Sequence, residues 1–313
     1  MDTKEKIGQL AGNISKVIKG KPEVVRLAVV SLLARGHLLI EDVPGIGKTT
    51  LAFSLARSID CGFHRVQFTS DLMPSDIVGV TVFNQNRSEF EFKPGPIFAN
   101  IVLADEINRT TPKTQSALLE AMNEGQVTVE NDTHALPRPF MVIATQNPLE
   151  FQGTYPLPES QMDRFIMRIR LGYPAIGDEK AILQAASSKA MAESLSPVLH
   201  AQDIVALQEQ VLNVKMDDSL LDYLLAIVDA TRTNDRLSLG VSPRGALFLQ
   251  GAARANALFE GRNYCIPDDI KNLAVPVLAH RVMFNTRAGA YGRRSEDAED
   301  VIRDIVEAVE VPV

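Results

Sequence analysis

The sequence predicts an α/β fold in the first half of the chain and a helical domain in the second. In the first half, short apolar runs alternate with segments of helical periodicity, which is typical of a parallel sheet covered on both faces. From about residue 174 onward, apolar residues recur only at helical spacing. Because Pro174 interrupts the chain within "LGYPAIG", we expect one domain over 1–172 and an all-helical domain over 173–313.

Five apolar runs are the expected strands of the sheet, and two other stretches are expected hairpins. The strands are "HLLIE", "HRVQFT", "NIVLADE", "FMVIATQ" and "FIMRIRL". The hairpins are "VGVTVFNQNRSEFEF" and "GQVTVENDTHALPRPF", which alternate apolar and polar residues around polar turns. Hairpins inserted in this way either decorate an edge of the sheet or project towards a substrate or partner.

Composition excludes several classes of protein. With 32 Lys and Arg against 39 Asp and Glu, the net charge of -7 argues against a nonspecific nucleic-acid binder. Two cysteines cannot form a disulfide framework, which favours a reducing compartment. The first 20 residues predict an amphipathic helix without a signal core, and no apolar run is long enough to span a membrane. We therefore expect a soluble cytoplasmic protein.

The stretch "LLIEDVPGIGKTT" fits the phosphate-binding pattern G-x-x-x-x-G-K-[ST], except that Asp42 replaces the first glycine. A predicted strand precedes it and a predicted helix follows. In such a loop the backbone amides and the lysine hold phosphates, and the hydroxyl contributes to a magnesium site. We expect the Asp42 carboxylate to point away from the phosphates and to brace the loop. The expected nucleotide-binding residues are Pro44, Gly45, Ile46, Gly47, Lys48, Thr49 and Thr50.

Polar side chains also follow two other predicted strands. Asp105 and Glu106 end "NIVLADE", at the carboxyl end of a strand, where ligands bind in open α/β sheets. Asp105 and Thr49 are the expected Mg²⁺ ligands, and Glu106 is expected to orient or deprotonate the attacking water. Asn147, at the exit of "FMVIATQNP", is suited to hold that water or the γ-phosphate, although Asn before Pro is also a common turn residue.

Two arginines complete the predicted site. In "GVSPRGALFL", Ser242 is a good N-cap, which places Arg244 in the first helical turn, where a cation opposes the helix dipole. A nearby phosphate would offset that conflict, so we expect Arg244 to contact the nucleotide. Arg164, in "LPESQMDRFIMRI", either pairs locally with Asp163 or Glu159 or serves as an arginine finger for a neighbouring subunit.

The ordered series "EDVPGIGKTT", "LADEINRTTPKTQSALLEAM", "ATQNPLEFQGTYPLPESQMDRF" and "GVSPRGA" resembles the MoxR family of AAA+ ATPases over essentially the whole chain. The resemblance implies a P-loop AAA+ nucleotide domain with two hairpin insertions, a small helical lid, and a ring, usually hexameric, with ATP at the subunit interfaces. "EDVPG" in place of a leading glycine is typical of the family. The implied roles are Lys48 and Thr49 as Walker A, Asp105 and Glu106 as Walker B, Asn147 as first sensor, Arg164 as finger and Arg244 as lid sensor; Arg109 is expected to face a subunit interface.

The resemblance also implies an activity. Members of the family are chaperone-like ATPases that use ATP and Mg²⁺, act with a partner carrying a von Willebrand factor A domain, and remodel or activate protein complexes. Three other hypotheses remain open: the motor subunit of a metal chelatase, a nucleic-acid motor, and a small-molecule kinase, which the arginines and the helical lid fit less well. The sequence does not identify the client protein.

Overall fold

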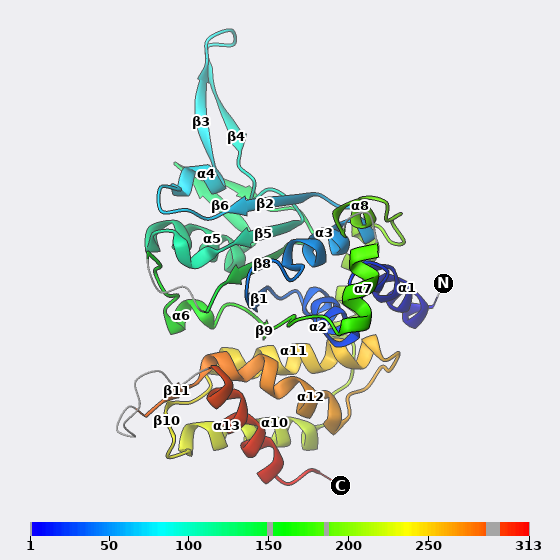
Figure 1. Cartoon of the computed structure of the whole chain (residues 1–313). Helices are drawn as coiled ribbons and strands as arrows, with labels where there is room; N and C mark the ends of the chain where they lie inside the picture. Colours follow the sequence, from blue (N-terminus) through cyan, green and yellow to red (C-terminus); the bar gives the residue numbers. More distant parts are fainter. Residues whose placement is uncertain (1, 149–152, 185–187, 286–294, 313) are drawn as a thin grey trace.

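Five parallel strands form the central sheet of the computed structural model, which describes residues 2–148, 153–184, 188–285 and 295–312. The strands lie in the order β2-β5-β8-β1-β9, and each neighbouring pair is parallel. They are β1 (Leu38–Glu41), β2 (Phe63–Gln67), β5 (Ile101–Asp105), β8 (Met141–Gln146) and β9 (Met167–Ile169). All five predicted strands and the α/β class are confirmed (Figure 1).

The sheet is buried on both faces. In β1, Leu38 and Ile40 join one apolar core, whereas the intervening Leu39 joins another on the opposite face. Successive side chains of a strand point to opposite faces, so a strand covered on both sides needs a continuous apolar run. The first core includes α1 (Thr3–Ser15), α2 (Pro22–Leu33) and α3 (Lys48–Ser58); the second includes α4 (Pro74–Val78) and α5 (Pro112–Glu124).

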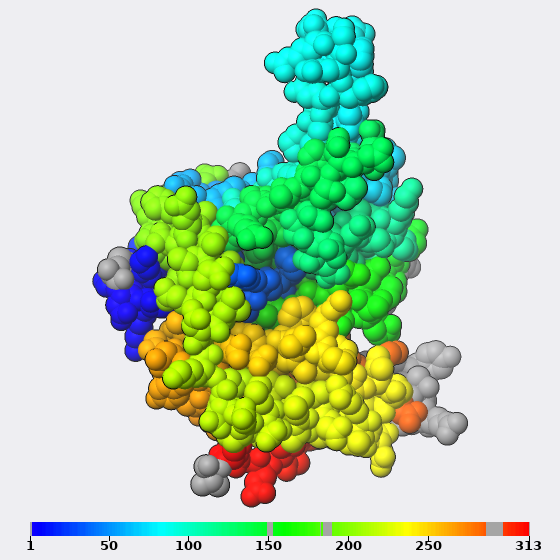
Figure 2. Space-filling model, turned by 180° about the vertical axis from the view of Figure 1, so that it is seen from behind, coloured from blue at the N-terminus to red at the C-terminus, as the bar shows by residue number. Residues whose placement is uncertain are grey.

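Both predicted hairpins are present. β3 (Gly79–Asn84) pairs with β4 (Glu89–Pro94), and β6 (Gln126–Val129) pairs with β7 (Asp132–Ala135). The β3–β4 hairpin rises above the rest of the surface (Figures 1 and 2). Phe92 of β4 stacks on His134 of β7 with ring centroids 3.9 Å apart, so the two hairpins are in direct contact.

The second half of the described chain is mainly helical, and its elements from α10 onward occupy the lower part of Figure 1. These helices are joined by an antiparallel ribbon of β10 (Leu237–Leu239) and β11 (Met283–Phe284), which the sequence analysis did not predict. The first helices, α7 (Ile176–Gln184) and α8 (Ser188–Glu193), differ from the rest because α8 packs on α3. The other elements are α9 (Ala201–Leu212), α10 (Asp218–Thr233), β10 (Leu237–Leu239), α11 (Pro243–Phe259), α12 (Pro267–Leu278), β11 (Met283–Phe284) and α13 (Ser295–Ala308); short turns are η1 (Ile107–Arg109), α6 (Glu159–Met162) and η2 (Ala279–Arg281).

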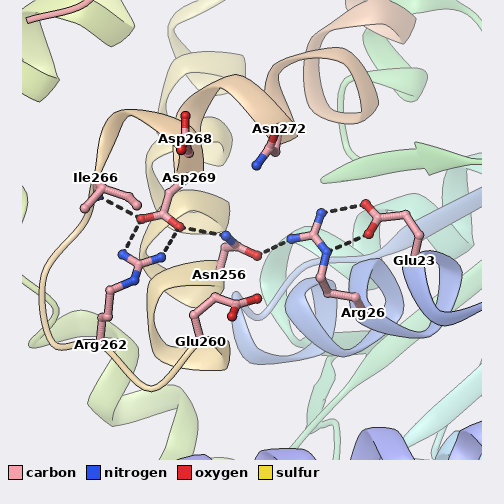
Figure 3. A pocket seen from close by; sticks show the side chains of 9 residues that line it. All are labelled: Glu23, Arg26, Asn256, Glu260, Arg262, Ile266, Asp268, Asp269 and Asn272. Atoms are coloured by element: carbon pink, nitrogen blue, oxygen red, sulfur yellow. Dashed lines mark hydrogen bonds and ion pairs between the residues drawn. The ribbon is translucent and has the colours of Figure 1, made fainter.

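A chain of polar contacts ties α2 to α11 and α12 (Figure 3). Asp269, whose side chain is 1% exposed, accepts two hydrogen bonds from Arg262, at 2.6 and 2.7 Å, and one from Asn256 at 2.7 Å. Asn256 in turn accepts a hydrogen bond from Arg26 of α2, which is also paired with Glu23. These residues border a polar cavity of about 620 Å³. Because the buried charges are paired, we interpret this cluster as a structural link between the helices.

Three smaller expectations concern the rest of the chain. Residues 149–152, part of the third motif, lie outside the described residues. In the part of the chain that is described, no helix has both the length and the apolar character needed to cross a bilayer. Cys61 and Cys265 are free thiols, and burial raises the pKa of each to about 12.

His37 is a buried, neutral histidine at the start of β1. Its Nδ1 accepts a hydrogen bond from the Val142 amide at 2.9 Å, so Nε2 carries the proton and donates it to the Met122 carbonyl at 3.0 Å. Burial lowers its pKa from 6.5 to about 4. The imidazole therefore joins β1, β8 and α5 only in its neutral form.

This pKa shift predicts acid sensitivity. The folded value of about 4 lies below the unfolded value of 6.5, so the unfolded chain binds more protons between these pH values. We expect the contribution of His37 to be complete above pH 6.5, and the free energy of unfolding to fall below it by up to about 1.4 kcal/mol per pH unit. In chemical denaturation, His37→Asn, which keeps an acceptor for Val142, should show a shallower pH slope. Burial also lowers the pKa of His280, but this histidine is present in the wild type and in the variant and contributes equally to both slopes. An unchanged slope in His37→Asn would therefore contradict the role assigned to His37.

Candidate functional site

The loop between β1 and α3 has the backbone shape of a phosphate-binding loop. Gly45 has φ +84° and Gly47 has φ +101°, both in the left-handed region that glycine adopts without strain. Gly47 is the N-cap of α3, so the loop leads directly into a helix N-terminus. Backbone amides at such a position attract anions.

Asp42 braces this loop, as expected. Its Oδ1 accepts the Val43 amide at 2.9 Å and its Oδ2 accepts the Gly172 amide at 2.7 Å. Its carbonyl oxygen accepts a hydrogen bond from the Lys48 ammonium at 2.6 Å. The residue in the first glycine position thus joins the start of the loop to the segment that follows β9, and its carboxylate is engaged there.

One cavity of about 640 Å³ unites most of the predicted site. All seven predicted nucleotide-binding residues border it, as do Asp105 and Glu106 at the end of β5. An apolar part of the same wall comes from the α1–α2 connection, from the segment after β9 and from α7. Its residues are Val17, Ile18, Leu171, Pro174 and Leu183.

Asp105 is held by two residues that the sequence analysis missed. Thr145 of β8 donates its hydroxyl to Oδ1 at 2.6 Å, and Arg65 of β2 binds Oδ2 at 2.6 Å. Both strands are direct neighbours of β5 in the sheet. The sequence "HRVQFT" could have indicated the role of Arg65, because alternation along a strand places Arg65 and Gln67 on one face at the carboxyl end of β2.

Glu106 lies in an uncommon conformation with φ +58° and ψ +48°. Such backbone geometry costs about 1–3 kcal/mol in a non-glycine residue. The hydrogen bond from the Glu106 amide to the Thr145 hydroxyl, at 2.9 Å, helps to hold this conformation. The side chain is 23% exposed, and its Oε2 accepts from Gln67 at 2.8 Å and lies 3.2 Å from Arg109 Nε. Arg109 therefore pairs with Glu106 of its own chain, and its predicted place at a subunit interface stays a prediction.

The other predicted residues do not border the cavity. Asn147 is buried directly after β8. Arg164 donates to the Leu119 carbonyl of α5 at 3.0 Å rather than pairing with Asp163 or Glu159, and its Nε is buried without a hydrogen-bond partner. Asp163 is bound instead by Arg281 of η2, at 2.9 Å.

Arg244 occupies the predicted place in its helix. Ser242 caps α11 by accepting the Gly245 amide at 3.1 Å, and Pro243 is the first helical residue. Arg244 is exposed in the following position. The predicted capping is confirmed, while the role of Arg244 towards a nucleotide stays a prediction.

Comparison with known proteins identifies both parts of the chain. Residues 37–167 match a family described as ATPase family associated with various cellular activities (AAA), and residues 229–305 match an AAA lid domain. The chain is 50% identical to the uncharacterised protein YeaC of Bacillus subtilis (strain 168) over 307 residues, covering 98% of this chain and 95% of that protein. It is 39% identical to Chaperone MoxR1 of Mycobacterium tuberculosis (strain ATCC 25618 / H37Rv) over 308 residues, covering 96% and 80%.

A solved structure gives the same answer. The crystal structure of a putative ATPase from Cytophaga hutchinsonii ATCC 33406 superposes with a TM-score of 0.90 at 37% identity, covering 99% of this chain and 96% of that one. Its agreement extends over the sheet and the helical lid together. The chain therefore belongs to the MoxR family of AAA+ ATPases.

Proposed function

We propose that this chain assembles into a ring, hexameric as in its family, that hydrolyses ATP to ADP and phosphate and uses this reaction to remodel or activate a protein complex. One observation carries the proposal: Lys48 and Thr49 border the same cavity as Asp105 and Glu106. A phosphate-binding loop and an acidic strand end are the two parts that hydrolysis of a nucleoside triphosphate requires. The name of the relative Chaperone MoxR1 supports the remodelling role.

The phosphates are expected to lie against the loop amides and Lys48, at the N-terminus of α3. Thr49 and Asp105 supply the hard oxygen donors that suit Mg²⁺, which commonly keeps water and phosphate oxygens as its other ligands. Within the described residues, no group of three or more His, Cys, Asp or Glu side chains is placed to hold a metal ion, which fits an ion shared with the phosphates. When bound, Mg²⁺ neutralises charge on the phosphate oxygens.

Glu106 is the proposed general base. Its carboxylate borders the cavity from the end of β5 and is oriented by Gln67 and Arg109. A carboxylate held in this way can orient a water molecule and accept its proton as the water attacks the γ-phosphate. Asn147 at the end of the neighbouring β8 is proposed to hold that water or the γ-phosphate.

The apolar part of the wall is suited to the nucleotide base. Val17, Ile18 and Leu171 face the cavity near the loop, so a flat aromatic ring system there would exchange water for apolar contacts. Lys21, which also borders the cavity, joins the α1–α2 connection to the segment after β9 by donating to the Tyr173 carbonyl at 2.7 Å. Because the base and the phosphates need opposite environments, the cavity has the polarity expected for ATP.

Arg164 and Arg244 are proposed to complete the site through assembly. We propose that Arg164 acts at the nucleotide of a neighbouring subunit, as an arginine finger, and that Arg244 contacts the nucleotide of its own subunit. We further propose a von Willebrand factor A domain protein as partner, a cytoplasmic location, and the division of the chain into 1–172 and 173–313. The net charge of -7 disfavours a nucleic-acid motor, and the chaperone name of the relative is the reason to prefer remodelling over a metal chelatase.

Replacing Glu106 tests the proposed chemistry. Glu106→Gln should still bind ATP, because the loop and Lys48 are unchanged, but steady-state phosphate release should fall by about 100-fold or more. Glu120→Gln removes the same charge from an exposed position on α5 and should keep wild-type turnover. Normal turnover in Glu106→Gln would rule out this role for the carboxylate.

Mixing two inactive variants tests the ring. A Lys48→Ala chain lacks a working nucleotide site but carries Arg164, and an Arg164→Ala chain has the reverse defect. Co-assembly should restore phosphate release, because one chain then supplies its arginine to the site of the other. As a control, Lys48→Ala mixed with Glu106→Gln should stay inactive, since neither chain has a complete site. Mixed assemblies of the first pair that show no activity would contradict action between subunits.

A further inference from the structure

The residue next to Arg164 is held by two elements of the lid. Asp163 follows α6 and precedes β9, and its Oδ1 lies 2.9 Å from Arg281 Nε. The Ser242 hydroxyl lies 3.2 and 3.3 Å from the two carboxylate oxygens and can donate to either. One carboxylate of the nucleotide domain therefore binds η2 and the N-cap of α11 together.

Arg281 is buried to an unusual degree for a cation, with 1% of its side chain exposed. Its guanidinium also donates to the carbonyls of Asp163 and Ile166, both at 3.3 Å, and to that of Phe165. It lies over the Phe248 ring of α11, 5.0 Å from the centroid. Burial lowers the pKa of Arg281 to about 10, and the Asp163 charge opposes this shift. Arg281 of the lid thus binds both the side chain of Asp163 and the backbone carbonyls on either side of Arg164.

The same contacts reach the helix turn that carries Arg244. Ser242 caps this turn while it contacts Asp163. A Cβ atom added at Gly245 would lie 2.6 Å from Val241 Cγ1 and 2.9 Å from Arg281 Cδ. Glycine at this position therefore leaves room for both Val241 and Arg281 against the first turn of α11. On the side of the nucleotide domain, the Arg164 guanidinium donates to the Leu119 carbonyl of α5.

We propose that Asp163 and Arg281 are positioning residues that join Arg164 to the first turn of α11, so that a movement of the lid on ATP binding displaces Arg164. The proposal rests on the function proposed above. It gives the ring a route between sites: the lid responds to its own nucleotide, and the attached Arg164 belongs to the site of the next subunit. A buried charge pair suits this task, because its two halves cannot separate without leaving an unpaired charge inside the protein.

Asp269 provides a matched control for Asp163. Each carboxylate belongs to an Asp–Arg pair with one side chain 1% exposed. The pair of Asp269 and Arg262, at 2.6 Å, continues through Asn256 to Arg26 of α2 and, within the described residues, makes no hydrogen bond or ion pair with the segment around Arg164. Asp163→Asn and Asp269→Asn each remove one charge and keep a polar side chain of the same shape. Both should lower the melting temperature, so stability alone does not distinguish them.

Hydrogen exchange with and without MgATP separates the two roles. It is measured on full-length chains that also carry Glu106→Gln, so that ATP is not hydrolysed during the exchange. In otherwise unmodified and Asp269→Asn chains, we expect ATP to slow exchange both at the loop over 44–50 and at the amides of Phe165 and Ile166. In Asp163→Asn the loop should still respond, while the response at Phe165 and Ile166 should be lost.

Each outcome has one meaning. Without any effect of ATP on the loop, the proposed nucleotide site is wrong, and the inference that depends on it is withdrawn. A loop response with no response at Phe165 and Ile166, or with the same response in Asp163→Asn as in Asp269→Asn, overturns the positioning role alone. If Asp163→Asn does not fold, Gly245→Ala, which keeps every charge but crowds Val241 and Arg281, should lose the same response, and its retention overturns the proposal.

Turnover gives a second readout that a purely structural role would not change. In chains with an intact Glu106, Asp163→Asn should lower kcat by about tenfold with KM for ATP nearly unchanged, because a misplaced Arg164 affects the reaction more than binding. Asp269→Asn should keep the wild-type kcat at temperatures where it is folded. Equal kcat values in the two variants would contradict the proposal.

Discussion

The site depends above all on the parallel register of the central sheet. β2, β5, β8 and β1 are neighbours, and their registers place Gln67 beside Asp105 and Glu41 beside Gln146. Parallel strands end at the same edge, so the residues that follow them are collected there. A slip of one residue in β5 would turn Asp105 to the other face of the sheet and away from Thr145 and Arg65. The apolar cores on both faces hold the strands in this register.

Carboxylates then connect segments that are remote in the sequence. Asp42 joins the loop to Gly172, Asp105 joins β5 to β2 and β8, and Asp163 joins the segment before β9 to the lid. Each is a charge bound by fixed donors, so its orientation is set by elements other than its own. This arrangement explains how a cavity built mainly from short loops keeps a defined shape.

Local signals predicted the fold and much of the site. Continuous apolar runs identified the five strands, and Ser242 with Pro243 located the start of α11, because periodicity and capping depend on nearby residues. Arg65, Gln67 and Thr145 were missed since their roles depend on which strands are neighbours. The contact of Arg164 with Leu119 and the pairing of Asp163 with Arg281, 118 residues later, arise only from tertiary packing. The β10–β11 ribbon was missed for another reason: its strands are too short to show a period.

The central claim is that the cavity around Lys48 is a working ATPase site. Its most direct test is phosphate release from MgATP by the purified chain, compared with Lys48→Ala and with Lys113→Ala, which alters an exposed lysine on α5. The account predicts continuous release by the wild-type and Lys113→Ala proteins and none above background by Lys48→Ala. No release by the wild type, or equal release by Lys48→Ala, would contradict it.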